Sequence, residues 1–387
     1  MESIAVFKYE LLLFLAVVCY LAVYSRRSQA VQLLYQPTKA NQSIISRLNK
    51  VISSFSPPFI LQGAVSQIFV AAKMSPNFSI KYTIESFKLE DGGSLKLELY
   101  PPNFYDMPET APVVFLLLGV CGSTREKYPR VASRRARSKG YRTVVINKRG
   151  FARTPLTSAR FFHKDELEDF NTVISHFHKR LPKANKYLVG TSQGALYTLK
   201  YLITHNKTTP IRCAVSISNP FDNEKNSQLI TPTYWGGKAM KVIAQQMKAL
   251  ISFHRENHHF HELMRRTIGH ADLHSILDSC FKPHDIFERL VHRIGEYETL
   301  GHFYETFKIN NDLHKVNTPV LFINNKEDPF ISFKVIPFEQ LYANEKFISL
   351  FTNKGGHVEY YSGLLFDWWA YKAAMEYIQT FEEGKHL

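Results

Sequence analysis

The stretch "YLVGTSQGALYTLKYL" runs from Tyr187 to Leu202 and changes its character at Ser192. An apolar, strand-like run precedes this serine, and a helical pattern follows it. Ser192 lies between Gly190 and Gly194, so the stretch matches the pattern G-x-S-x-G. At a strand–turn–helix corner this pattern predicts a strained turn that holds the serine hydroxyl above a sheet, as a nucleophile. Because five residues can match by chance, a purely structural turn serine is the alternative, and the rest of the chain must decide.

Apolar runs typical of buried strands recur along the chain, and helical patterns lie between most of them. The predicted strands are residues 112–119, 141–147, 186–190, 212–218, 319–324 and 347–352. The predicted helices are residues 126–139, 164–180, 193–204 and 363–381. This alternation predicts an α/β fold, with a mostly parallel central sheet flanked by helices on both faces.

Two segments depart from the alternation. Residues 79–99 contain "DGG" between two alternating runs, which predicts an antiparallel hairpin at the start of the sheet. From about 219 to 305 the strand pattern stops and helical, His-rich sequence replaces it, which predicts a helical lid inserted between two strands. We therefore expect an α/β domain over 79–387, preceded by a helical or irregular linker over 31–78 that packs on it.

The N-terminal segment, residues 1–30, predicts an uncleaved, single-pass membrane helix. The run "LLLFLAVVCYLAVYS" carries no charge, and Arg26 and Arg27 follow it directly. The uncharged part is short for a span of about 20 residues, so a cleaved signal peptide is the alternative. One basic residue precedes the run and three follow it by Lys39, which favours a cytosolic body. We expect the protein at the endoplasmic reticulum or another endomembrane.

Chain order indicates partners for Ser192. A serine hydroxyl needs a base, and in this kind of fold the acid follows a later strand and the histidine follows the last one. Asp328 comes just after the strand at 319–324, and His357 comes just after the strand at 347–352. Glu327 is the alternative acid. We predict a catalytic Ser192–Asp328–His357 triad.

An ester carbonyl under attack also needs amide donors for its developing oxyanion. The amide of Gln193, at the start of a helix, is one candidate, and the amide of Val120, after the first parallel strand, is the second. Cys121 in the same loop could be a thiol nucleophile, although a small loop residue is the simpler interpretation. This mechanism needs no metal or organic cofactor.

Other patterns suggest different chemistry. His254, His258 and His261 have a spacing that can hold zinc on one helix face, but no further ligand completes a convincing set. His163 begins a sequence close to the H-x4-D signature of acyltransferases, but the fifth residue after it is Glu168. We interpret these segments as a polar lid helix and an acidic helix start.

The composition limits the classes of partner. The 387 residues carry a formal charge of +14, with 45% hydrophobic and 13% aromatic residues, which argues against disorder. Positive charge suits anionic lipid or nucleic acid, but no nucleic-acid-binding module accompanies it. The densest basic run, residues 133–142, fits a solvated helix face. The four cysteines form no pattern typical of a disulfide framework.

Taken together, these motifs resemble the α/β-hydrolases, and within them the YheT-like group of membrane-anchored lipid esterases. The matching pieces are "GVCGSTREKY", "INKRGFARTPLTSARFFHKDELEDF", "GTSQGALYTLKYL", "SISNPFD", "NTPVLFINNKEDPFI" and "NKGGHVEYYSGLL". The resemblance implies a Ser–Asp–His triad, an N-terminal anchor and glycerolipid esters, such as monoacylglycerols or phospholipids, as substrates. Gln193 departs from the leucine or methionine more usual there.

We therefore expect a serine hydrolase that cleaves lipid carboxylic esters through an acyl-enzyme. Two alternatives stay open: a catalytically silent ligand-binding protein with the same fold, and an acyltransferase. The sequence does not indicate the oligomeric state.

Overall fold

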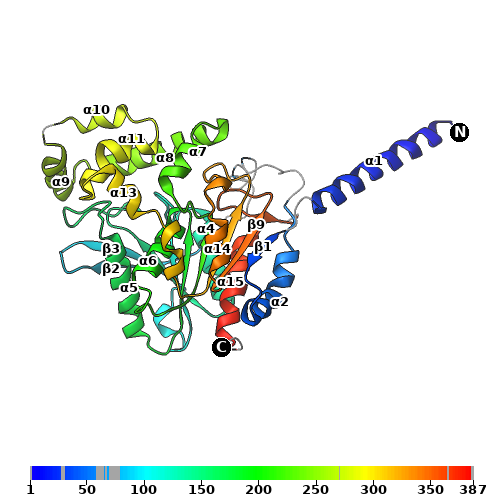
Figure 1. Cartoon of the computed structure of the whole chain (residues 1–387), viewed down its shortest axis with the longest axis horizontal. Helices are drawn as coiled ribbons and strands as arrows, with labels where there is room; N and C mark the ends of the chain where they lie inside the picture. The colour runs from blue at the N-terminus through cyan, green and yellow to red at the C-terminus, as the bar shows by residue number, and fades with distance from the viewer. Residues whose placement is uncertain are drawn as a thin grey trace.

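The computed structural model describes residues 2–27, 31–57, 65, 68, 79–269, 271–363 and 366–384. Its centre is a nine-stranded sheet in the order β1-β9-β8-β7-β6-β4-β5-β3-β2 (Figure 1). The strands are β1 (Gln32–Tyr35), β2 (Thr83–Lys88), β3 (Ser94–Tyr100), β4 (Val113–Leu117), β5 (Arg142–Asn147), β6 (Lys186–Thr191), β7 (Ile211–Ile217), β8 (Val320–Asn325) and β9 (Phe347–Thr352). Neighbours from β5 to β9 pair in parallel, while β1, β2 and β3 pair antiparallel at the two edges. The mostly parallel sheet predicted from the sequence is confirmed.

Alternate residues of each central strand face opposite layers of helices. In β4, Val113 and Phe115 belong to one buried cluster, and Val114 and Leu116 belong to the other. The first cluster lies under α5 (Glu166–Arg180), α6 (Gln193–Thr204) and α14 (Phe338–Ala343). The second lies under α2 (Lys39–Ser53), α4 (Lys127–Ser138) and α15 (Trp369–Glu382). Burial on both faces explains why these strands are continuously apolar in sequence.

A group of helices, which we call the helical insertion, lies between β7 and β8 at the upper left of Figure 1. It contains α7 (Asn223–Ile230), α8 (Tyr234–Phe253), α9 (His258–Ile268), α10 (Leu273–Asp278), α11 (Pro283–Ile286), α12 (His292–Ile294) and α13 (Leu300–Thr306), with a π-helical turn at Phe287–Val291. Short 3-10 helices occupy Phe104–Asp106, Asn310–Lys315 and Phe333–Val335. The insertion begins and ends above the strands that precede and follow it, so it covers the carboxyl edge of the sheet.

The segment before the hairpin adds an element that the sequence did not predict. β1 pairs antiparallel with β9, and α2 packs against α15. Trp369 Nε1 donates to the Val51 carbonyl at 2.6 Å, and the Trp369 ring lies 4.6 Å from that of Phe55. Residues 31–57 are therefore built into the sheet and its helix layer. The remainder of the predicted linker lies mostly outside the described residues.

The C-terminal helix starts later than predicted. α15 begins at Trp369 instead of near residue 363, because the small antiparallel pair β10 (Tyr361–Ser362) and β11 (Asp367–Trp368) precedes it. Residues 364 and 365 lie outside the described residues. The predicted hairpin over 79–99 is present as β2 and β3, in which Leu89 and Gly93 pair across the turn.

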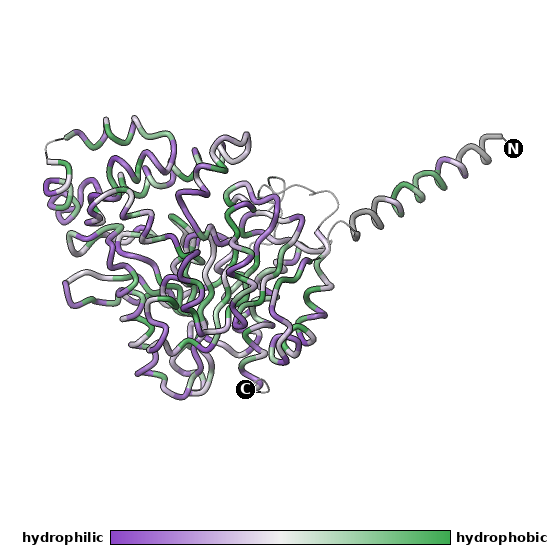
Figure 2. The backbone as a smooth tube through the Cα atoms, in the orientation of Figure 1, coloured by the Kyte–Doolittle hydropathy of each residue, from purple (hydrophilic) through white to green (hydrophobic). Residues whose placement is uncertain are grey.

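The N-terminal helix α1 (Glu2–Arg27) extends away from the body, and Figure 2 shows apolar residues along its middle. Over the described part of the chain, no helix combines the length and apolarity needed to cross a membrane. The predicted membrane-spanning helix is therefore not supported.

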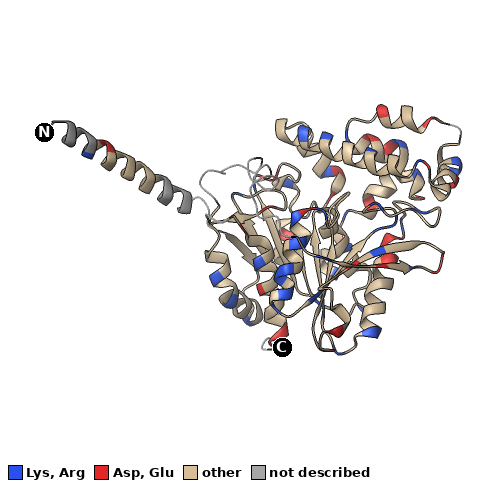
Figure 3. Cartoon of the chain, turned by 180° about the vertical axis from the view of Figure 1, so that it is seen from behind, with Lys and Arg blue, Asp and Glu red and all other residues tan. Residues whose placement is uncertain are grey.

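The basic run at 133–142 includes the second half of α4, and Figure 3 shows Lys and Arg in blue on the helices of this side of the molecule. Arg135 pairs with Asp367, and Lys139 pairs with Glu376 of α15 at 2.8 Å. Part of this charge thus joins α4 to the C-terminal segment.

Candidate functional site

Ser192 occupies the sharp corner between β6 and α6 that the sequence predicted. Its backbone has φ +57° and ψ −122°, a conformation that non-glycine residues rarely adopt. A Cβ atom on Gly190 would lie 2.3 Å from the Gly194 carbonyl, and one on Gly194 would lie 2.1 Å from the Leu117 carbonyl. Both glycines are therefore required by the close approach of α6 to the sheet.

The three predicted triad residues meet at this corner. His357 Nε2 lies 2.7 Å from Ser192 Oγ, and His357 Nδ1 lies 2.8 Å from Asp328 Oδ2. The other Asp328 oxygen accepts the Phe330 and Ile331 amides at 2.8 and 3.1 Å. These bonds fix the carboxylate, which is almost fully buried. One line of hydrogen bonds thus joins the ends of β6, β8 and β9.

The electrostatics of His357 favour a base that can become charged. Burial lowers its pKa, but the charge and hydrogen bond of Asp328 raise it more, so the pKa lies above the ordinary 6.5. A charged imidazole would therefore be stabilised when it takes a proton from Ser192.

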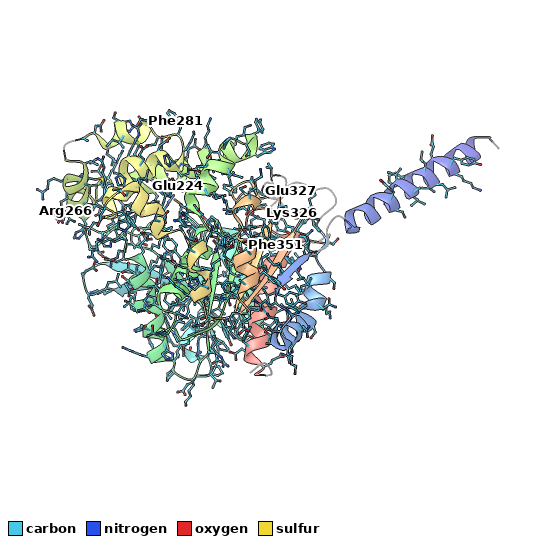
Figure 4. The ribbon with its side chains drawn as sticks, viewed as in Figure 1. Glu224, Arg266, Phe281, Lys326, Glu327 and Phe351 are labelled. Carbon is cyan, nitrogen blue, oxygen red and sulfur yellow. The ribbon has the colours of Figure 1, made fainter. Side chains whose placement is uncertain are left out.

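The neighbouring acid, Glu327, has a different environment. Its carboxylate pairs with Lys354 at 2.5 Å and is 38% exposed, compared with 1% for the Asp328 side chain. Figure 4 labels Glu327 beside Lys326 on the loop that follows β8. Glu327 makes a surface ion pair, and the histidine contacts Asp328.

The loop after β4 packs against the serine. A Cβ on Gly119 would lie 3.3 Å from Ser192 Cβ, so this glycine allows the close approach. Val120, the next residue, lines a pocket together with Ser192 and Gln193. Gln193 is the first residue of α6, where an amide has no acceptor within its own helix. The two predicted oxyanion donors therefore belong to the two backbone segments beside Ser192.

Several residues that support this loop and the histidine were not found from the sequence. The Gly119 amide donates to the Tyr128 hydroxyl at 3.3 Å, and the Ser123 amide donates to Glu126 at 2.7 Å. Ser218, at the end of β7, hydrogen-bonds the His357 carbonyl and the Tyr360 hydroxyl. The fold brings Tyr128 to Gly119 and Ser218 to His357, and the one local signal was the position of Ser218 directly after β7.

The pocket beside Ser192 extends under the helical insertion. It is open to solvent. Its apolar lining includes Met240 and Ile243 of α8, Phe287 and Phe330, whereas Asn223, Asn226 and Ser227 of α7 contribute polar groups. Such a lining suits a ligand with an apolar chain and a polar group.

Cys121 and the three histidines with zinc-like spacing, His254, His258 and His261, were the other chemical groups that the sequence singled out. Burial raises the pKa of Cys121 to about 12, which keeps the thiol protonated and poorly nucleophilic. His254 is buried and lies 2.8 Å from the Gly150 carbonyl, while His258 and His261 belong to α9. Within the described ranges, no group of three or more His, Cys, Asp or Glu residues could hold a metal ion.

The acyltransferase-like segment makes ion pairs with residues outside the triad. His163 is buried between Asp165 and Glu296, with its ring nitrogens 3.3 and 3.0 Å from their carboxylates. Glu168 pairs with His205 at 3.3 Å. These contacts join the start of α5 to the insertion and to the end of α6.

Comparison with known proteins agrees with this architecture. Residues 112–349 match the family model of the alpha/beta hydrolase fold, so the chain belongs to this family, as its motifs suggested. An abhydrolase domain-containing protein of Dictyostelium discoideum is 26% identical over 365 residues, which cover 90% of this chain and 89% of that protein.

Two other relatives have names that state an activity. Phospholipase ABHD3 of Bos taurus is 27% identical over 74% of this chain and 68% of its own length. Monoacylglycerol lipase of Saccharomyces cerevisiae is 23% identical over 65% of this chain and 56% of its own. Among solved structures, the Pyrococcus furiosus esterase Pf2001 superposes with a TM-score of 0.50 at 15% identity, over 79% of this chain and 95% of that one. This last similarity concerns the fold alone.

Proposed function

We propose that the protein is a carboxylic ester hydrolase acting on lipid esters of the monoacylglycerol or phospholipid class, with Ser192 as its nucleophile. The observation that carries the proposal is the continuous line of hydrogen bonds from Ser192 through His357 to Asp328. The names of relatives that are a phospholipase and a monoacylglycerol lipase support the substrate class. The mostly apolar pocket supports an acyl chain.

The mechanism follows from the arrangement of these groups. Ser192 Oγ attacks the ester carbonyl while His357 Nε2 takes its proton, and Asp328 stabilises the imidazolium. The Val120 and Gln193 amides hold the oxyanion. Collapse of the tetrahedral intermediate breaks the ester C–O bond, and His357 gives its proton to the leaving alcohol. Water, activated by the same histidine, then releases the fatty acid from Ser192.

The test is Ser192→Ala in the full chain. We expect ester hydrolysis to fall by about 10⁴-fold or more, because the base and the oxyanion donors cannot replace the nucleophile. A fluorophosphonate probe should label the wild-type protein at Ser192 and leave the variant unlabelled. A circular-dichroism spectrum unchanged from wild type shows that the variant folds. Activity within about tenfold of wild type would contradict the assignment, and an unlabelled wild-type serine would favour a silent binding protein.

We also propose that α1 attaches the enzyme to the endoplasmic reticulum or another endomembrane. Leu12, Leu13 and Phe14, in the middle of the helix, are more than half exposed, so this apolar surface is free to enter lipid. Full-length protein should stay with the membrane fraction in high salt, and a chain starting at Ser28 should be released. Release of both chains by salt would contradict attachment through apolar contacts.

A further inference from the structure

Helix α8 of the insertion has two unlike faces. Its buried side includes Met240, Ala244, Met247 and Ile251. Met240 and the neighbouring Ile243 also line the pocket that contains Ser192. One side of α8 therefore borders the space where we place the substrate, and its opposite side is exposed to solvent.

The exposed side carries large aromatic residues. Tyr234 is 68% exposed and Trp235 is 50% exposed, at the first turn of α8. Phe281, between α10 and α11, is 66% exposed, and its ring lies 5.8 Å from Lys248 Nζ of α8. Figure 4 shows Phe281 at the outer end of the insertion. We call this surface the outer face of α8: Tyr234, Trp235, Lys238, Lys241, Lys248 and Phe281.

The charge of this face has one sign along α8. The helix contains Lys238, Lys241 and Lys248 and has no Asp or Glu. Positions 234, 238, 241, 245 and 248 follow the spacing of a single helix stripe. Lys238 Nζ lies 4.4 Å from the centre of the Tyr234 ring and 5.4 Å from that of Trp235, so cation and aromatic rings form one group. Among the neighbouring acidic residues, Asp285 accepts hydrogen bonds from the Phe281 and Lys282 amides.

This chemistry matches the surface of an anionic bilayer. Tyr and Trp combine an apolar ring with a polar group, and such residues concentrate where lipid meets water. Lysine can bury its methylene chain among apolar groups while its ammonium pairs with lipid phosphate or carboxylate. The basic helix α4 has charge without exposed aromatic residues on it, which makes it a suitable control surface.

We propose that the outer face of α8 docks on an anionic lipid bilayer and brings the pocket behind it to the membrane surface. The docking itself is independent of the chemistry at Ser192. Only its consequence, access of a membrane-borne ester to the pocket, rests on the proposed function.

Trp235 provides a direct probe, because Trp368 and Trp369, the two others, are buried. Full-length protein would be mixed with vesicles of phosphatidylcholine, with or without phosphatidylserine, whose acyl chains carry bromine as a fluorescence quencher. The signal of Trp235→Phe gives the contribution of the other two tryptophans. We expect anionic vesicles to quench Trp235 and shift its emission to shorter wavelength, and high salt to weaken both effects.

The charge requirement is tested with matched triple variants. Lys238→Gln/Lys241→Gln/Lys248→Gln removes three charges from the outer face, whereas Lys39→Gln/Lys50→Gln/Arg137→Gln removes three from α2 and α4. A lysine near an anionic surface contributes roughly fivefold to partition, so the first variant should need at least about tenfold more anionic lipid for half-maximal quenching. The control variant should need about the same amount of lipid as wild type.

Two results would overturn the proposal. One is an unquenched Trp235 in protein that floats with the anionic vesicles, since the face would then point away from the lipid. The other is a shift of Trp235 emission that grows with protein concentration without vesicles, which would mean that a second copy covers the face. Hydrolysis of a short soluble ester, measured in parallel, reports on Ser192 alone, so failure of docking and failure of the proposed function are distinguishable.

Discussion

Adjacent carboxylates at positions 327 and 328 show how strongly the environment of one residue decides its use. Asp328 has both oxygens engaged, one by His357 and the other by two backbone amides. Glu327 reaches outward to Lys354. A buried carboxylate that orients an imidazole is coupled to the chemistry, whereas an exposed ion pair contributes about 0–1 kcal/mol to stability.

We therefore expect Asp328→Asn to lower kcat by about 10⁴-fold, because the amide favours the wrong histidine tautomer. Glu327→Gln, the matched neutral substitution one residue earlier, should change kcat less than about threefold. Steady-state kinetics with a soluble ester measure both. Equal losses in the two variants would mean that the loop as a whole, rather than Asp328, supports the histidine.

The pH dependence should follow the protonation of His357. The imidazole must be neutral to accept the serine proton, and its pKa in the free enzyme lies above 6.5. kcat/KM should thus fall as pH falls through a midpoint above 6.5. In Asp328→Asn the chief group that raises this pKa is gone, so the midpoint of the residual activity should move to lower pH.

Glu126, directly before α4, is another group whose pKa lies near neutral pH, and its neutral variant provides the control. Burial raises the pKa of Glu126 to about 7. If Glu126→Gln moved the acid limb of the profile while Asp328→Asn left it in place, the limb would belong to the loop carboxylate and the assignment to His357 would be wrong.

Among the elements, the loop between β4 and α4 has a tightly constrained backbone. Cys121 has φ +56°, and the Gly122 amide closes a tight turn onto the Gly119 carbonyl at 3.0 Å. Tyr128, from the first turn of α4, holds the Gly119 amide, and a Cβ on Gly122 would lie 2.7 Å from the same hydroxyl. The hydroxyl therefore holds the backbone directly before Val120, and the absence of a side chain at Gly122 leaves room for it.

We predict that Tyr128→Phe lowers kcat by about tenfold and leaves KM nearly unchanged. Removing one oxyanion donor outright costs about 10²–10³ in kcat, and a donor that is only loosened should cost less. Tyr377→Phe removes another buried tyrosine hydroxyl, one without a hydrogen-bond partner in the described part of the chain, and should keep wild-type kcat. A rise in KM at constant kcat in Tyr128→Phe would indicate a role in ground-state binding instead.

At the scale of the whole molecule, residues 31–57 pack against the C-terminal part of the chain. β1 extends the sheet beyond β9, and the side chains of Ile44, Leu48 and Phe55 complete the cluster under α15. The hydrogen bond from Trp369 to Val51 closes this contact. The segment before the hairpin is thus needed to cover the C-terminal helix.

A chain that begins at Ser28 should fold and hydrolyse a short soluble ester at a rate within about twofold of full length, because the triad and α2 remain. A chain that begins at residue 79 should unfold at much lower urea concentration or aggregate. It exposes the buried side chains around Trp369 that residues 31–57 cover in the full chain. Truncation of a single buried Phe or Trp side chain to Ala already costs about 3–5 kcal/mol, and this shortened chain lacks Phe55 and its neighbours. Equal urea midpoints for the two shortened chains would show that residues 31–57 add no stability.

The sequence by itself determined the features that are written in continuous stretches. Strands buried on both faces are apolar throughout, so β4 to β9 could be located by composition alone. The corner at Ser192 needs two glycines within five residues, and the order of Ser192, Asp328 and His357 along the chain follows the order of the strand ends. The strands and the corner are local patterns, and the order of the three residues is a property of the chain itself, so all of them can be recognised in the sequence.

Only the tertiary structure decided the features that depend on partners far apart in the chain. A four-residue strand such as β1 has too few residues for a periodic signal, and its pairing with β9 defines it. Tyr128 and Ser218 look like ordinary buried polar residues until folding places them beside Gly119 and His357. The outer face of α8 can likewise be recognised only from the fold, because the fold buries the opposite side of this helix against the pocket. Each of these depends on contacts between segments, and a contact is a property of the fold.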